Sequence, residues 1–174
     1  YFEYMNKTFG LIVALFLSLT LNAVEPALEN SKVREALNAM QGKPAPELRL
    51  DGWMNSQALD LKKLKGKIVV LDFWATWCGP CIASIPKTNE MMKKYADKGV
   101  VIIGVCHQRG AEKMEATAEE KGIKYPIAVD KGTNEDYKAN SFPDYYIIDR
   151  KGNLRWADIA NRDVEKAIDH LLAE

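Results

Sequence analysis

The sequence IVVLDFWATWCGPC, residues 68–81, joins an apolar run to two cysteines that are separated by two residues. Residues 68–74 are apolar at both alternating positions except for Asp72, which predicts a central strand in a sheet that is covered on both faces. Residues 81–97 carry apolar side chains at helical spacing, so a helix should follow the strand directly. The two cysteines are therefore expected where a buried strand ends and a helix begins.

Cys78 and Cys81 are suited to exchange electrons with another thiol or disulfide. The backbone N–H groups and the dipole of the helix point at Cys78, and they should lower the pKa of its thiol from ~8.5. Cys81 lies one turn further along the same side of the helix, where it can attack a mixed disulfide formed at Cys78. A buried inert pair and a zinc site are the alternatives, although zinc would need further ligands and the histidines of the chain are His107 and His170.

Asp72 places a carboxyl group inside the apolar run, before the cysteines. Burial should raise the pKa of this carboxyl group, because the charged form loses its hydration. From the strand that leads into the helix, Asp72 can lie beneath the cysteine pair and accept the proton of Cys81 as that thiol attacks. The alternative is an aspartate at a sheet edge that contacts solvent or a backbone donor.

Composition and charge fit one domain of ordinary size. The chain has 174 residues, of which 47% are hydrophobic, and 24 basic side chains balance 24 acidic ones. This balance gives no reason to expect a nucleic-acid partner. Three cysteines cannot all pair within the chain, and they are too few for a disulfide framework.

Cys106 is the cysteine left over, and His107 follows it. Neighbours in a strand point to opposite faces, so these two side chains cannot easily bind one metal ion together. We interpret them as a buried structural cysteine and a strand-end histidine, with a second redox role for Cys106 as the alternative. His170 is expected to be a solvated residue near the end of the last helix.

The N-terminal residues have the pattern of an export signal. Lys7 precedes an apolar run at residues 9–21, and Ala23 follows as a small residue. The run is shorter than the ~20 residues of a transmembrane helix. We therefore expect a signal peptide cleaved after Ala23, with an uncleaved membrane anchor through residues 9–21 as the alternative. The residues before Met5 are interpreted as an upstream extension.

The remaining pattern predicts alternating strands and helices. GKPAP at 42–46 breaks a short amphipathic helix that Ser31 should cap, and we place a domain boundary there. We expect strands at 48–50, 58–61, 68–74, 100–106, 125–129, 145–149 and 154–158, and helices at 81–97, 111–121, 133–139 and 164–173. This order predicts an α/β fold with a mixed sheet. The predicted division is 1–23 for the upstream extension and signal peptide, 24–41 for an N-terminal helical segment and linker, and 42–174 for the main domain.

DFWATWCGPC at 72–81, followed by Pro86, resembles the active-site segment of thioredoxins. The export pattern and the segment from GKPAPELRL to the cysteines resemble the TlpA/ResA-type redoxin branch of that family, and the resemblance covers residues 42–174. It implies a thioredoxin-like fold, with a central mixed β-sheet flanked by helices and an N-terminal extension. The resemblance also implies roles for three residues. These are Cys78 as attacking thiol, Cys81 as resolving thiol and Asp72 as the buried acid.

The resemblance further assigns a role to SFPDYYIID, residues 141–149. This segment stands where thioredoxin-like proteins carry a cis-proline before a strand that faces the cysteines. Pro143 is therefore expected to be cis and to bring the backbone of Phe142 beside Cys78, where an extended substrate segment can add as a strand. An ordinary trans-proline that opens an edge strand is the alternative. The other expected substrate-contacting residues are Trp77, Gly79 and Pro80.

These observations predict an exported thiol–disulfide oxidoreductase that reduces protein disulfides in the periplasm or at the outer face of the cytoplasmic membrane. Gly79 and Pro80 favour reduction, because oxidases and isomerases of the family usually carry a histidine between the cysteines. The redox-active disulfide is the only cofactor that we expect, with no metal, and a membrane thiol electron donor is implied. Two features match plain thioredoxin better than the members that reduce apocytochrome c. Ser84 stands where those members commonly carry glutamate, and Asp72 where they often carry asparagine.

Two other function classes remain as alternatives. A Cu(I)-binding thioredoxin-like metallochaperone would also use two thiolates, but such proteins usually space their cysteines by three residues and add a distal histidine. A thiol peroxidase would carry a threonine three residues before the attacking cysteine, where this chain has Ala75.

Overall fold

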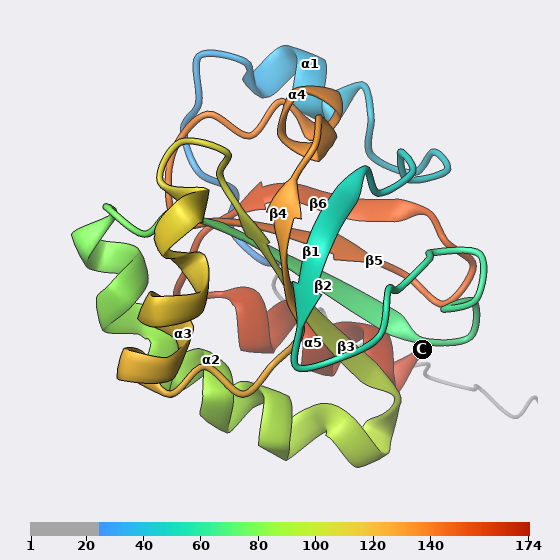
Figure 1. Cartoon of the computed structure of the whole chain (residues 1–174). Coiled ribbons are helices and arrows are strands. Elements are labelled where there is room, and N and C mark those ends of the chain that lie inside the picture. Colours follow the sequence, from blue (N-terminus) through green and yellow to red (C-terminus); the bar gives the residue numbers. More distant parts are fainter. Residues whose placement is uncertain (1–24) are drawn as a thin grey trace, which may run out of the picture.

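One six-stranded sheet forms the centre of the protein (Figure 1). The computed structural model describes residues 25–174, so the predictions for residues 1–23 lie outside the described residues. The strand order is β1-β4-β3-β2-β5-β6, with β2 parallel to β3 and antiparallel to β5, which confirms the predicted mixed sheet. The strands are β1 Leu50–Met54, β2 Ile68–Trp74, β3 Val100–Cys106, β4 Ile127–Asp130, β5 Asp144–Ile148 and β6 Leu154–Ile159.

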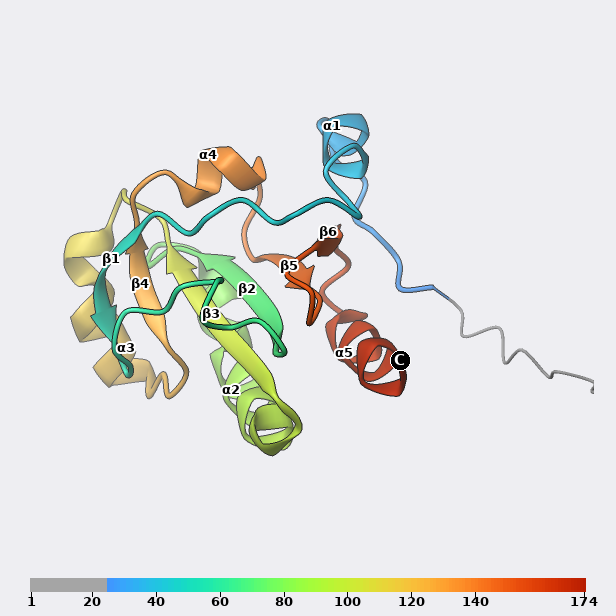
Figure 2. The same ribbon diagram turned by 90° about the vertical axis from the view of Figure 1, so that its right-hand side faces the viewer.

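Helices cover both faces of this sheet (Figure 2). One face carries α2 Gly79–Tyr95, α3 Met114–Lys121 and α5 Val164–Ala173, and the other carries α1 Arg34–Asn38 and α4 Thr133–Tyr137. Two short 3-10 helices, η1 Ala96–Lys98 and η2 Ala111–Lys113, follow α2 and precede α3. Apolar side chains from the irregular segment between α1 and β2 complete the second layer. Among the helices of residues 25–174, none combines the length and apolar composition that a membrane span requires.

All residues of β2 are buried, as the apolar run predicts. Val69 and Leu71 pack into the core on the α1 side of the sheet, whereas Val70 and Trp74 pack into the core on the α2 side. Side chains alternate between the faces of a strand. Asp72 therefore points to the α2 side, toward the layer that also contains both cysteines of the pair.

The segment before β2 differs from the prediction. No strand forms at 58–61, where Leu59 and Leu61 instead pack on the α1-side core from irregular backbone. The neighbouring edge of the sheet is already taken by β1, which pairs with β4 and begins only at Leu50 instead of covering 48–50. The alternating apolar residues of this segment thus pack against the sheet, but the segment is not one of its strands.

Two helix starts also differ from the prediction. Ser31 does not cap α1, because the helix begins at Arg34 and the Ser31 hydroxyl oxygen accepts a hydrogen bond from the Val33 N–H at 3.3 Å. The second helix, α2, begins at Gly79, ahead of the predicted residue 81, because Cys78 is its N-cap.

Candidate active site

Cys78 and Cys81 form a disulfide at the N-terminus of α2, with their sulfur atoms 2.10 Å and their Cα atoms 5.2 Å apart. Cys78 has extended backbone, φ −89° and ψ 100°, and its sulfur accepts a hydrogen bond from the Cys81 N–H at 3.2 Å. Pro80 lies in the first turn, where the lack of an N–H removes no helical hydrogen bond. The remaining free N–H groups of this turn, and the positive end of the helix dipole, face the Cys78 sulfur. A thiolate at Cys78 is stabilised there when the pair is reduced.

The two cysteines differ in their access to solvent. Cys78 retains 6% of its surface exposed and Cys81 2%. Gly79 and Pro80 are exposed between them, and Trp77 is 47% exposed just before them. Cys78 is therefore the more exposed cysteine of the pair, and it lies next to this exposed rim.

The rings of Trp77, His107 and Phe142 form an aromatic cluster beside the cysteine pair. The Trp77 ring centroid lies 5.9 Å from that of His107 and 6.0 Å from that of Phe142, and those two rings are 5.5 Å apart. The Trp77 indole N–H donates to the Arg109 carbonyl at 2.8 Å, and the Arg109 guanidinium lies 4.2 Å above the indole ring. Aromatic contacts and the cation–π contact hold Trp77 in one orientation. The sequence alone did not connect His107 or Arg109 with the site, because no local pattern links them to Trp77.

The Phe142–Pro143 peptide bond is cis, as the resemblance implied. This bond leads into β5, which pairs with β2 so that Asp144 lies opposite Phe73. Pro143 and Pro80 together line two grooves, with volumes of about 270 and 810 Å³. Three of the predicted substrate-contacting residues, Pro80, Phe142 and Pro143, are thus brought together at one surface.

Asp72 is buried with 2% of its surface exposed, and it lies opposite Tyr145 in the register of β2 with β5. Burial raises the pKa of Asp72 from 3.8 to about 7, and the Tyr145 hydroxyl offsets part of this increase. The Asp72 Oδ1 atom has no hydrogen-bond partner among the described residues. A carboxyl group that changes its protonation state near neutral pH, on the side of the cysteine pair, has the properties of a general base.

Tyr145 and Thr88 connect the buried Asp72 with the surface. Their hydroxyl oxygens lie 3.5 Å apart, and both residues line the 270 Å³ groove. The sequence alone singles out neither residue. The available signal for Tyr145 was its position two residues after Pro143, in a strand expected to face the cysteines.

Two further buried acids, Asp144 and Asp158, follow Pro143 in the chain. Asp144 and Asp158 have 2% of their surface exposed, and burial and the adjacent Asp158 raise the pKa of Asp144 well above its usual range. Asp158 forms an ion pair with Arg34 at 2.7 Å, and the Tyr146 hydroxyl donates to Asp144 at 3.4 Å. The Arg34 guanidinium therefore balances the charge of Asp158.

Two further candidates, Cys106 and His170, are buried or partly buried. Cys106 is fully buried, and burial, with the nearby carboxylates of Glu112 and Asp130, raises the pKa of its thiol to about 12. His170 corrects our expectation of a solvated residue, because it is partly buried with its ring 5.5 Å from that of Trp156. No sequence pattern near His170 indicated its contact with Trp156 of β6. Within residues 25–174, no three His, Cys, Asp or Glu side chains are grouped so that they could hold a metal ion.

Known proteins are similar to this chain in sequence and in structure. A family profile described as Redoxin matches residues 40–172. The thioredoxin-like protein YneN of Bacillus subtilis is 33% identical over 142 residues, which cover 78% of this chain and 83% of YneN. The thiol-disulfide oxidoreductase ResA of Bacillus cereus is 32% identical over 152 residues, which cover 86% of this chain and 87% of ResA.

Solved structures agree with the sequence relatives. The crystal structure of a thiol:disulfide interchange protein described as DsbE, from Chlorobium tepidum, has a TM-score of 0.67 and 29% identity. The similarity covers 76% of this chain and 97% of that one. The mixed sheet with helices on both faces is therefore the thioredoxin-like fold.

Proposed function

The chain belongs to the Redoxin family and is a thioredoxin-like thiol–disulfide oxidoreductase, and we propose that it acts as a reductase of protein disulfides. The observation that carries this proposal is the Cys78–Cys81 disulfide at the N-terminus of α2, on the face of β2 that also presents Asp72. Gly79 and Pro80 between the cysteines add support, since the resemblance to thioredoxin associates this pair with reduction.

In the first step, the thiolate of reduced Cys78 attacks one sulfur of a substrate disulfide. A bond forms between Cys78 Sγ and that sulfur, the substrate S–S bond breaks, and the other substrate sulfur leaves as a thiolate that takes a proton from solvent. The N-terminus of α2 stabilises the attacking thiolate through its free N–H groups.

In the second step, Cys81 resolves the mixed disulfide. Its thiol gives its proton to the carboxylate of Asp72 and attacks Cys78 Sγ, so the intramolecular disulfide forms as the bond to the substrate breaks. The second substrate sulfur leaves as a thiolate and is protonated. The cysteine pair has then lost two electrons and the substrate disulfide has gained them. With a pKa of about 7, Asp72 can accept the proton and release it again near neutral pH.

Substrate contacts are assigned to the exposed rim around Cys78. An extended substrate segment would lie along the backbone of Phe142 next to cis-Pro143 and add as a short strand. Trp77 would pack on the substrate from the other side, with Gly79 and Pro80 between them. The two grooves that Pro80 and Pro143 line support this placement, because they leave room for side chains on both sides of the segment.

The oxidised pair must be reduced again before the next cycle. A dithiol donor of the membrane is the class of reductant that an exported protein would require, and we propose such a partner. Export to the periplasm or the outer face of the cytoplasmic membrane is supported by the apolar run at 9–21 after Lys7, which could also act as an anchor. A membrane donor and an anchored position would fit together.

The reduction potential of the Cys78–Cys81 couple tests the proposed direction. The protein would be equilibrated in graded thiol–disulfide buffers, alkylated and analysed by mass. A potential near that of thioredoxin, about −270 mV, is expected for a reductase. A potential near that of strongly oxidising family members, about −120 mV, would contradict reduction and indicate a protein that introduces disulfides.

A further inference from the structure

The 270 Å³ groove beside the disulfide has an apolar interior and a basic rim. It lies between α2 and the connection from β6 to α5, and Pro80 and Pro143 separate it from the larger groove. Its apolar lining includes Met91 and Val164. The charged residues that line it are Lys87 and Arg162, and both are exposed.

Acidic groups close to this rim are already engaged. Glu165 lies near enough to Lys87 for the lysine to lower its pKa, but its carboxylate is bound at 2.6 Å by Lys94. The carboxylate of Asp163, next to Arg162, accepts the Ala27 N–H at 2.8 Å. Within residues 25–174, neither Lys87 nor Arg162 has a carboxylate within ion-pair distance. Their positive charges are therefore available to a ligand.

One wall of the larger groove comes from outside residues 40–172, which the Redoxin profile matches. Residues 29–33 form this wall, opposite Phe142 and Pro143. A backbone hydrogen bond fixes the start of this segment to β6, because the Glu29 N–H donates to the Asp158 carbonyl at 2.9 Å. Arg34 fastens the segment from its other end through the carbonyls of Ala157 and Asp158.

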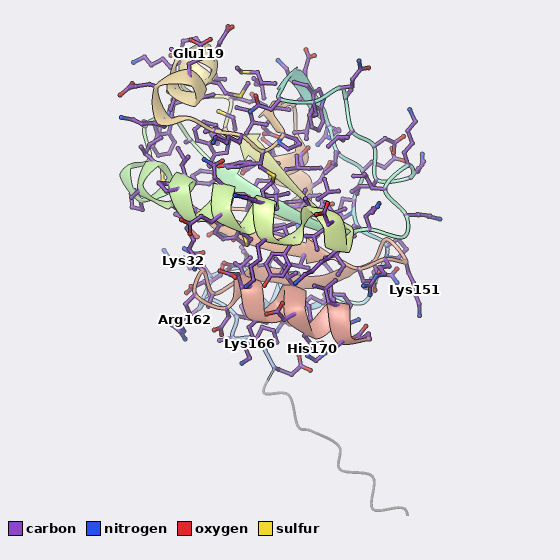
Figure 3. All side chains as sticks on the ribbon, turned by 90° about the horizontal axis from the view of Figure 1, so that it is seen from below. Lys32, Glu119, Lys151, Arg162, Lys166 and His170 are labelled. Atoms are coloured by element: carbon purple, nitrogen blue, oxygen red, sulfur yellow. A yellow bond between two sulfur atoms is a disulfide. The ribbon has the colours of Figure 1, made fainter. Side chains whose placement is uncertain are left out.

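The wall contributes a further exposed cation, Lys32, together with the exposed Glu29. Figure 3 shows Lys32 and Arg162 at the end of the molecule where α2 begins, whereas Lys151 lies at the opposite end. Lys32, Lys87 and Arg162 come from three separate parts of the chain. They line the two grooves that share Pro80 and Pro143, beside Cys78. Glu29 lines only the larger groove, where its negative charge offsets one positive charge. The positive charge is therefore least compensated around Lys87 and Arg162.

We propose that the 270 Å³ groove binds an acidic side chain, in particular a glutamate, that lies close to the cystine of the substrate protein. This inference rests on the proposed reductase function and adds a substrate class to it. The methylene groups of a glutamate would contact Met91 and Val164, and its carboxylate would meet Lys87 and Arg162 at the rim. Arginine can bind a carboxylate through two parallel hydrogen bonds, which favours a fixed orientation.

Model peptides test this selectivity. Three disulfide-linked peptide dimers would carry a cysteine followed by two glutamates, two glutamines or two lysines. The reduced protein would be mixed with each peptide at low and high ionic strength, and oxidation would be followed by tryptophan fluorescence. Each rate would be divided by the rate at which dithiothreitol reduces the same peptide, which corrects for the intrinsic reactivity of its disulfide. We expect the glutamate peptide to react about three- to tenfold faster than the glutamine peptide at low salt, with the ratio falling at high salt.

Two double variants localise the effect. Lys87→Gln/Arg162→Gln should bring the glutamate-to-glutamine ratio close to 1. Lys65→Gln/Lys151→Gln removes the same charge from exposed residues that line a groove elsewhere on the molecule, and it should keep the ratio. Equal ratios in both variants, or no preference in the unmodified protein, would overturn the proposal.

A neutral small disulfide separates this inference from the proposed function. Hydroxyethyl disulfide has no charge and no side chain for the groove, so its rate reports the reactivity of the cysteine pair. If hydroxyethyl disulfide and all three peptides reacted only at the uncatalysed rate, the reductase function would be contradicted, and the substrate class with it. Reaction with hydroxyethyl disulfide and no discrimination among the peptides would contradict the groove assignment alone.

Discussion

Asp72 of β2 and Tyr145 of β5 lie opposite each other in the sheet, and the Tyr145 hydroxyl lowers the pKa of the Asp72 carboxyl group. Burial and the Tyr145 hydroxyl act in opposite directions on the pKa of Asp72, which settles at about 7. A buried carboxyl group without any donor would stay protonated to higher pH. The pairing therefore brings the pKa of Asp72 close to neutral pH, where the proposed general base would accept a proton from Cys81.

Asp72→Asn should slow the resolving step, because an amide cannot accept the proton of Cys81. Loss of a general base typically lowers a rate by about 10²- to 10⁴-fold. Rapid-quench measurements with insulin should show that the mixed disulfide at Cys78 accumulates in the variant, while the first attack is slowed much less. Equal slowing of both steps would show that Asp72 acts on the attacking thiol instead.

Tyr145→Phe should shift the pH profile of the resolving step to higher pH. Removing the hydroxyl leaves the charged form of Asp72 with one donor fewer, so the pKa of Asp72 should rise above about 7. The midpoint of the rate against pH gives this shift directly. Tyr137→Phe is the matched control, because its buried hydroxyl donates to the Pro46 carbonyl and its ring packs on the α1 side of the sheet. An identical shift in both variants would exclude a specific role of Tyr145.

Asp72→Asn should also stabilise the protein at high pH. The pKa of Asp72 is raised from 3.8 to about 7 by folding, so between these values the folded state keeps a proton that the unfolded state has released. The free energy of unfolding therefore falls as the pH rises through this window and is constant above it. The variant lacks this loss and should exceed the unmodified protein by about 2–4 kcal/mol more at pH 8 than at pH 4. Urea unfolding at both pH values measures the difference, and a gap that does not change with pH would contradict burial of Asp72 in the charged form.

The centre of the fold could be predicted because its signals are local in sequence. Apolar residues at nearly every position from 68 to 74 indicated a strand covered on both faces, and the structure confirms it as β2. The spacing of Cys78 and Cys81 placed both on one side of a helix start, where the structure has their disulfide. By contrast, the alternation at Leu59 and Leu61 was misleading, since such a pattern also arises in an irregular segment that packs on a face of the sheet.

Side-chain contacts between distant segments could not be predicted. Arg34 and Asp158 are 124 positions apart, and nothing near either residue indicates the other. The contact of Trp77 with Arg109 depends likewise on how two loops meet above the sheet. The alternation of side chains along a strand indicates the face of the sheet on which Asp72 lies. Its neighbour Tyr145 could be identified only from the register of β2 with β5.

Replacement of each cysteine should separate the two steps of reduction. Cys78→Ser should abolish the reduction of insulin disulfides, because no accessible thiolate remains to attack. Cys81→Ser should trap mixed disulfides between Cys78 and its partners, because no resolving thiol remains. Non-reducing electrophoresis and mass analysis of the products identify the linked residue. Turnover retained in Cys78→Ser, or trapping through Cys106, would contradict the assignment of roles.

Arg34→Met should destabilise the fold, since it leaves the charge of Asp158 buried next to Asp144. The Arg34 side chain is 20% exposed and that of Asp158 3%, so breaking this pair removes a largely desolvated contact. We expect a loss of about 2–4 kcal/mol in the free energy of unfolding, measured in urea at pH 7.

Two further variants distinguish a buried charge from the loss of packing. Adding Asp158→Asn to Arg34→Met should recover much of the lost stability, because it removes the uncompensated buried charge. The contacts of the Arg34 methylene and guanidinium groups are not restored, so the recovery should be incomplete. Lys62→Met breaks an exposed ion pair with Glu47, whose side chains are 74% and 76% exposed, and it should leave the unfolding curve unchanged. Failure of Asp158→Asn to restore any stability would mean that Arg34 acts through its hydrogen bonds to the carbonyls of β6. In that case the anchoring of residues 29–33, and with it the wall of the larger groove, would depend on the guanidinium group itself.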